Sequence, residues 1–317
     1  MKNDDVILKL RDYYKENCEK LVFVGEKRLS TNNNCKMYYL DISKSEEQKN
    51  YKKLFQEYLL FYIRNRDQLS SIKVLNDALS SEQLSSALLY HGKKIHENKG
   101  LYPNSDIERS GLYGELFDDF YLNIVKNEEV ISLYTLRAGF NIPNAKGVDL
   151  VSATVEEDNL KLIFSEAKFV SSISSASQAL VEDIIGNDTQ IGHITASYIN
   201  DYSSFLLNKT HSIYLDKNNK KVILGSLLEL NNLILNDDCT PIEAINKLNI
   251  KIRFDFFAIF HHNNKTIEQN REYFLKIVDN FNSSILETGI NNYDIEVIFI
   301  PTNNTSMDIK RELELWD

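Results

Sequence analysis

The chain has 317 residues and a net charge of −10, from 36 Lys and Arg against 46 Asp and Glu. Its content of 43% hydrophobic and 11% aromatic residues is typical of a folded globular protein and excludes a disordered chain. The acidic balance excludes a protein whose whole surface attracts nucleic acid. A nucleic-acid substrate would therefore require a local basic groove, a bound metal ion or a partner protein.

The cysteines and the hydropathy pattern indicate where the protein works. Cys18, Cys35 and Cys239 are an odd and widely spaced set without a CxxC motif, which predicts free thiols in a reducing compartment. No stretch reaches the roughly 20 apolar residues that span a bilayer, and the N-terminal segment is acidic without a long apolar run. We therefore expect a cytoplasmic protein that does not enter the membrane.

The first part of the chain predicts an N-terminal α+β region over residues 1–107. Two β-branched and aromatic runs, residues 21–27 and 36–42, flank an Asn-rich turn and predict neighbouring strands. Helical spacing of apolar residues follows over 45–66 and 70–98, and Gly and Pro then interrupt the pattern over 98–106. We see no chemistry in this region and expect it to serve as a docking surface for a partner.

From residue 108 onward the pattern predicts a second domain, 108–317, of the α/β class. The order is a helix over 110–126, a strand over 131–140 and two strands within 147–170, followed by helices near 175–186 and 189–208. Then come a helix near 221–236, a strand over 251–260, a helix near 267–286, a strand over 293–301 and a terminal helix. Such an order predicts a mixed sheet flanked by helices.

Charged residues interrupt two of the predicted apolar strands. Asp149 lies in one strand, and Glu166 and Lys168 lie two residues apart in the next, so that both project from one face. If the two strands are neighbours, Asp149 can lie beside Glu166, although the sequence does not fix the register. Paired carboxylates suit Mg²⁺ or Mn²⁺, and a nearby lysine can orient an attacking water. The alternative is an ion pair on a solvated sheet edge.

These residues resemble the pattern of the PD-(D/E)xK nuclease superfamily. Gly147-Val148-Asp149 and Glu166-Ala167-Lys168 carry the resemblance, and no proline precedes Asp149. The preceding helix contains Glu115 in "GELFDDFYL", where its alternative role is part of a solvated polar face. Residues 108–317 resemble the nuclease subunit of the Hachiman anti-phage defence system.

The resemblance implies a restriction-endonuclease-like mixed sheet flanked by helices and a Mg²⁺- or Mn²⁺-dependent nuclease. It implies Asp149, Glu166 and Glu115 as metal ligands, and Lys168 as a catalytic residue beside them. It also implies DNA as the substrate and a helicase subunit as the partner.

Two other functions stay open at the level of sequence. One is a binding or regulatory protein that keeps the nuclease fold without turnover, and the other is a nuclease of the same fold that acts on RNA. The chain has no Walker A loop, GxGxxG or GxSxG motif, so a nucleotide-driven motor and a serine hydrolase find no support.

Overall fold

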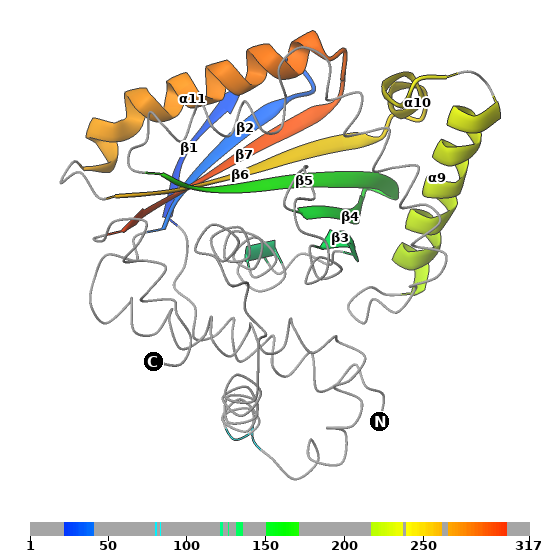
Figure 1. Ribbon diagram of the computed structural model, residues 1–317, viewed down its shortest axis with the longest axis horizontal. Coiled ribbons are helices and arrows are strands. Elements are labelled where there is room, and N and C mark those ends of the chain that lie inside the picture. Colours follow the sequence, from blue (N-terminus) through cyan, green and yellow to red (C-terminus); the bar gives the residue numbers. More distant parts are fainter. Residues whose placement is uncertain are drawn as a thin grey trace, which may run out of the picture.

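A seven-stranded mixed sheet organises the described part of the chain (Figure 1). In the computed structural model, the described residues are 22–40, 80, 83, 121–122, 126, 131–135, 150–170, 217–236, 239–261 and 266–302. The order across the sheet is β1-β2-β7-β6-β5-β4-β3. The strands are β1 (Val22–Arg28), β2 (Asn34–Tyr39), β3 (Ile131–Thr135), β4 (Leu150–Glu156), β5 (Asn159–Val170), β6 (Lys251–His261) and β7 (Tyr293–Thr302).

Strand directions divide the sheet into a parallel centre and antiparallel margins. Strands β2, β7, β6 and β5 are parallel to one another, β1 is antiparallel to β2, and β3, β4 and β5 form an antiparallel succession. The parallel strands are rich in β-branched and aromatic residues, as strands covered on both faces require. The predicted α/β class and mixed sheet are confirmed.

The hairpin between β4 and β5 explains the acidic turn seen in the sequence. Glu156 pairs with Asn159, which leaves Glu157 and Asp158 as a two-residue loop. Both loop residues have positive φ angles, 50° and 64°, the left-handed backbone that this kind of hairpin turn requires. The amide of Asn159 donates a hydrogen bond of 2.9 Å to the Glu157 carbonyl. The sharp turn therefore fixes the β4–β5 register for the residues that follow.

Three described helices accompany the sheet: α9 (Lys217–Asn236), α10 (Pro241–Lys247) and α11 (Ile267–Glu287). Helices α9 and α11 confirm two predictions within a few residues. Sequence analysis did not predict α10, which has only seven residues. Its start is nevertheless encoded locally, because Thr240 and Glu243 form a reciprocal capping box around Pro241 at the first helical turn.

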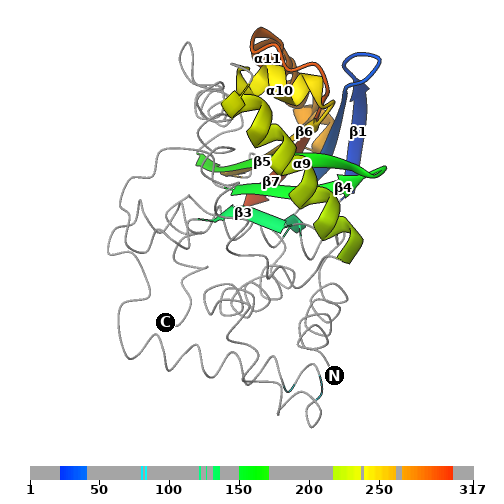
Figure 2. The same ribbon diagram turned by 90° about the vertical axis from the view of Figure 1, so that its right-hand side faces the viewer.

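The three helices cover one face of the sheet, which we call the helix face. Helix α9 lies against β4 and β5, and α11 lies against β2 and β7 (Figure 2). The core between them contains parallel ring stacks, with centroids 3.7 Å apart for Phe256 and Phe281 and 3.6 Å apart for Phe274 and Phe299. Burial of these aromatic side chains is a major source of stability, at about 2 kcal/mol or more for each.

The opposite face of the sheet is also buried at its centre. It carries Ile163, Phe257 and Ile298, none of which is exposed. Tyr121, from the helix predicted over 110–126, packs edge-on against Phe257 with ring centroids 5.0 Å apart. Tyr121 and its neighbour Leu122 are both fully buried. Part of the segment that precedes β3 therefore covers the opposite face.

Strands β1 and β2 belong to the same sheet as the rest, since β2 is hydrogen-bonded in parallel to β7. The predicted division at residue 107 stays a prediction, because that boundary lies outside the described residues, as do the helices expected over 45–66 and 70–98. Cys35 and Cys239 are buried free thiols, as predicted. Among the described helices, none is long and apolar enough to cross a bilayer.

Candidate functional site

Glu166 and Lys168 form an ion pair on the helix face of β5. The Lys168 Nζ atom lies 2.5 Å from Glu166 Oε1. The Glu166 side chain is 2% exposed, whereas the Lys168 side chain is 25% exposed. The alternation along β5 puts both residues on the face that also carries the core residue Phe164. The pair is thus buried at its carboxylate and reached by solvent at its ammonium group.

Burial of the Glu166 carboxylate does not fit the alternative of an ion pair on a solvated edge. The described pairing of β5 with β4 ends at Ser165, so among the described residues only β6 lies beside Glu166 and Lys168. Glu166 is in register with Phe256 of β6, and Lys168 is in register with Ala258, both fully buried. A carboxylate in such surroundings loses most of its hydration, so it needs a cation or hydrogen-bond donors to stay ionised.

Asp149 lies outside the described residues, but the register that leads to it is described. Leu150, the first residue of β4, is paired with Ser165 of β5. Asp149 directly precedes Leu150, and Glu166 directly follows Ser165 in this antiparallel pair. The predicted pairing of the two strands is therefore confirmed as far as Leu150 and Ser165, and the position of Asp149 beside Glu166 stays a prediction.

Glu115 also lies outside the described residues. The nearest described part of its predicted helix is Tyr121, six residues later, which packs on the opposite face of the sheet from Glu166. The role of Glu115 stays a prediction.

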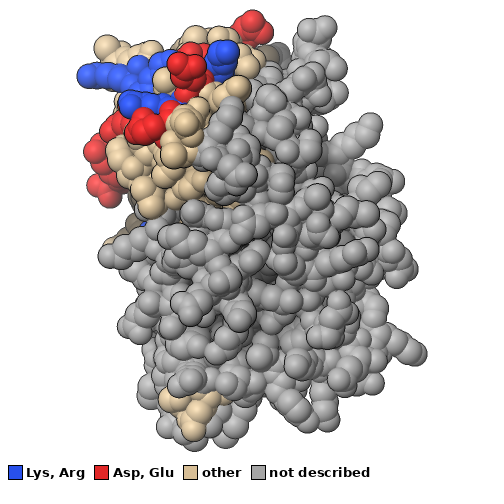
Figure 3. All heavy atoms as spheres, turned by 90° about the vertical axis from the view of Figure 1, so that its left-hand side faces the viewer, with Lys and Arg blue, Asp and Glu red and all other residues tan. Residues whose placement is uncertain are grey.

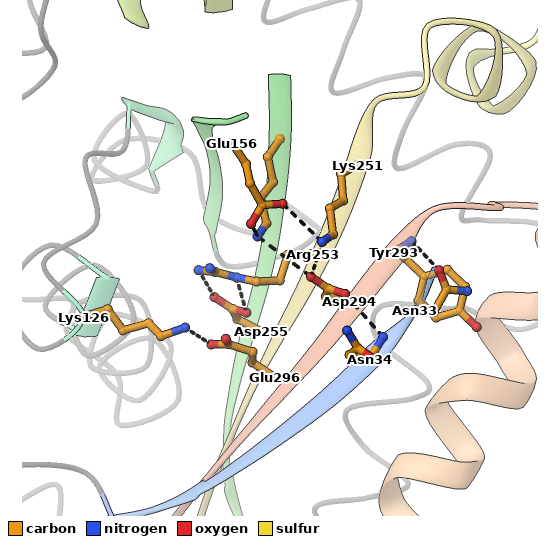
Figure 4. Close-up of polar contacts among 11 residues, drawn as sticks. Asn33, Asn34, Lys126, Glu156, Lys251, Arg253, Asp255, Tyr293, Asp294 and Glu296 are labelled. Carbon is orange, nitrogen blue, oxygen red and sulfur yellow. Dashed lines mark hydrogen bonds and ion pairs between the residues drawn. The ribbon is translucent and has the colours of Figure 1, made fainter. Parts of the chain in front are cut away.

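A second group of charges, missed in the sequence analysis, lies on the opposite face at the centre of the sheet (Figure 4). Arg253 donates two hydrogen bonds of 2.8 Å to the two carboxylate oxygens of Asp255, and both residues are buried. Lys126 pairs with Glu296 of β7, which is in register with Asp255. We call these four residues the opposite-face cluster. Two cations against two carboxylates make it electrically neutral.

Burial and the nearby carboxylates shape the environment of Tyr121 next to this cluster. Burial is the largest cause that raises the pKa of the Tyr121 phenol, and the negative charges of Glu296 and Asp255 raise it further. The phenol is therefore neutral at physiological pH. Its hydroxyl and those of Ser152 and Ser165 are buried without a hydrogen-bond partner. Buried hydroxyls therefore lie on the same face as the paired charges of the cluster.

A third group of charged residues lies at the end of the sheet where β6 and β7 begin. Lys251 lies 2.7 Å from Asp294 and 3.1 Å from Glu156, and Lys161 lies 3.0 Å from Glu156. Partial burial alone would raise the pKa of Glu156, but its pairing with Lys161 and Lys251 lowers the pKa overall. Partial burial alone would lower the pKa of Lys251, but Asp294 and Glu156 raise it overall. This network connects strands β4 to β7.

The three groups differ in what they can do chemically. In the opposite-face cluster, the Arg253–Asp255 pair is bidentate and buried, which holds its charges in place, while Lys126 beside it is partly exposed. In the Glu166–Lys168 pair, the Lys168 side chain is partly exposed to solvent. Within the described ranges, no three His, Cys, Asp or Glu residues gather as metal ligands. A metal centre would consequently need Asp149 or another residue beyond those ranges.

The chain matches the protein-family model HamA over residues 12–314. This range contains every strand of the sheet and all four predicted site residues, Glu115, Asp149, Glu166 and Lys168. The comparison with curated proteins found no match.

Proposed function

Since the chain belongs to the HamA family and is therefore a protein of Hachiman anti-phage defence, we propose that it is the nuclease of that system. In this proposal it hydrolyses phosphodiester bonds of DNA with Mg²⁺ or Mn²⁺ and acts together with a helicase subunit. The observation that carries the proposal is the ion pair of Glu166 and Lys168, a buried carboxylate joined to a partly exposed ammonium group on an inner strand.

The donor set supports a hard divalent cation. Carboxylate oxygens are the protein ligands that Mg²⁺ and Mn²⁺ prefer, usually one or two of them together with waters. We propose that Glu166 and Asp149 hold the ion, with Glu115 as a third ligand. Continuing the β4–β5 register by one step would bring Asp149 opposite Glu166. The bound ion would supply a water of lowered pKa and neutralise charge on the phosphate.

Lys168 has a separate role in the proposal. Its ammonium group neutralises Glu166 in the structure, with 25% of the side chain exposed. If Glu166 held a metal ion, the ammonium group of Lys168 would be available to orient the attacking water and to stabilise charge on the phosphoryl oxygens.

Charge explains why this nuclease would work with a partner. The chain carries a net charge of −10. On the face shown in Figure 3, described Lys and Arg side chains lie among Asp and Glu side chains, without a separate basic patch. A chain with this net charge attracts DNA weakly at physiological salt. A helicase subunit would supply the affinity for DNA and present the strand to the metal site.

The test is cleavage of plasmid DNA by the purified chain with Mg²⁺ or Mn²⁺, with and without the helicase subunit encoded beside it. The wild type is compared with Lys168→Ala. Lys161→Ala is the matched control, because Lys161 is on the same strand but makes its ion pairs with Glu156 and Asp294 on the opposite face. Loss of the catalytic lysine should reduce cleavage by roughly a hundredfold or more, while the control retains activity per folded molecule.

One observation favours a second candidate, a nuclease fold that binds a partner without turnover. The Lys168 ammonium group lies 2.5 Å from the Glu166 carboxylate and neutralises it, as it would in a purely structural pair. In that case, neither wild type nor variant cleaves DNA or RNA in any metal condition, and Lys168→Ala still binds the helicase subunit. Cleavage of RNA but not DNA would instead identify an RNA-directed enzyme and overturn the choice of substrate.

A further inference from the structure

The outer side of α9 contains a glycine that no contact with the described residues requires. Gly225 lies in the middle of the 20-residue helix and is exposed. A Cβ atom added at this position would meet no atom within 4 Å, and the backbone there is not in the left-handed region. Glycine weakens a helix interior relative to other residues because it has more conformational freedom to lose. No contact in the described structure compensates for this cost.

The residues around Gly225 form a patch with apolar and charged members. The positions three and four residues away on either side share its side of the helix. They are Lys221, Val222, Leu228 and Glu229, of which all but Val222 are exposed. Leu228 is 40% exposed. We call these five residues the α9 patch. Figure 2 looks directly onto α9, which lies in front of the sheet in that view.

The α9 patch is complementary to itself. We propose that it binds a second copy of this chain through an antiparallel α9–α9 contact that crosses at Gly225. A two-fold axis at Gly225 puts each position opposite its mirror position in the partner copy. Lys221 then faces Glu229 of the other copy, and Val222 faces its Leu228. Both contacts occur twice, so the interface contains two ion pairs and two apolar pairs.

Each member of the patch gains something from this contact that the single chain does not provide. Lys221 and Glu229 make no ion pair within the part of the chain that the structure describes. Leu228 loses its exposed apolar surface to the partner helix. Two glycines at the crossing point let the helices approach more closely than the usual separation of about 8–10 Å. Because one helix pair buries less than about 1,200 Å², we expect a weak dimer.

The experiment is sedimentation equilibrium of the full chain over a concentration series, with variants of the α9 patch. We expect the wild type to dimerise with a Kd of about 1–100 µM, as small transient interfaces do. Gly225→Leu should be monomeric throughout, and its melting temperature should rise by about 1–3 °C, because the new side chain has free space and favours the helix. Gly225→Ala should weaken the dimer to a smaller extent.

Charge reversal tests the symmetry of the contact. Lys221→Glu or Glu229→Lys alone creates two like-charge contacts per dimer and should weaken association by about tenfold. The double variant restores both ion pairs with reversed sign and should recover most of the affinity. A wild type that stays monomeric, or a dimer that neither Gly225→Leu nor the single reversals disturb, would overturn the proposal. All of these measurements are independent of the proposed nuclease activity.

Discussion

Removal of one partner from the buried Arg253–Asp255 pair should destabilise the fold without damaging the proposed active site. Asp255→Asn keeps the shape of the side chain but removes the charge that faces the guanidinium group. The Arg253 side chain is 4% exposed and that of Asp255 is not exposed at all, with two hydrogen bonds of 2.8 Å between them. A buried charge that loses its partner costs about 3–5 kcal/mol. We therefore expect the free energy of unfolding to fall by that amount.

The measurement is urea unfolding of wild type, Asp255→Asn and the double variant Arg253→Met/Asp255→Leu. Replacement of a whole buried ion pair by apolar side chains is often neutral or stabilising. The double variant should therefore be close to the wild type in stability, although each single change is costly. This difference separates the burial of an unpaired charge from the loss of packing.

The second measurement compares the DNA cleavage activity per folded molecule of the wild type and the double variant. The pair lies on the opposite face from Glu166 and Lys168, so a double variant with normal stability should cleave DNA at the wild-type rate. A loss of less than about 1 kcal/mol in Asp255→Asn would refute the estimate of its burial cost. Loss of activity in the stable double variant would refute the assignment of chemistry to the helix face.

Three smaller changes test other parts of the structure. Lys168→Met should keep a stabilisation by Mg²⁺ of about 1.4 kcal/mol at a Mg²⁺ concentration of ten times its Kd. Glu166→Gln should lose this stabilisation, which is measured in a thermal melt. Equal stabilisation of both variants would contradict the metal assignment. Glu156→Gln should lower stability at pH 7, and this deficit should shrink as pH falls through the lowered pKa of Glu156, where the carboxylate takes up a proton. For a carboxylate that is 44% exposed we expect a deficit under about 1 kcal/mol at pH 7, and a deficit in urea unfolding that does not change as the pH is lowered would count against the ion pairs. Ser165→Ala removes a buried hydroxyl without a hydrogen-bond partner, so unfolding free energy should stay level or rise by up to about 1 kcal/mol; a clear fall would show that the hydroxyl is satisfied.

Periodicity in the sequence was sufficient to predict the elements with the strongest patterns. Strands β5, β6 and β7 are long apolar runs, and α11 repeats apolar residues at helical spacing, so each was predicted within a few residues. Helix α10 was missed because seven residues are too few to show a period. Its signal was the capping box of Thr240 and Glu243, which depends on two residues and not on a repeat.

The candidate site could be predicted only in part. Alternation within β5 was enough to put Glu166 and Lys168 on one face. The register toward Asp149 was not predictable, because it depends on the two-residue turn at Glu157 and Asp158, whose backbone angles the sequence pattern does not specify. Pairing across strands also depends on sheet order, which brings β7 beside β2 from the other end of the chain.

A charged pair inside an apolar strand is therefore not enough to predict a catalytic site, as two strands of this sheet show. Arg253 and Asp255 are two residues apart in β6 just as Glu166 and Lys168 are in β5, and both pairs hold a buried carboxylate against a cation. The sequence patterns are equivalent, but the surroundings differ. The β6 pair is bidentate and buried, whereas Lys168 of the β5 pair remains partly exposed. A carboxylate whose counter-ion reaches solvent can exchange that ammonium group for a metal ion, and this difference in access is the physical reason for proposing the chemistry on β5 and not on β6.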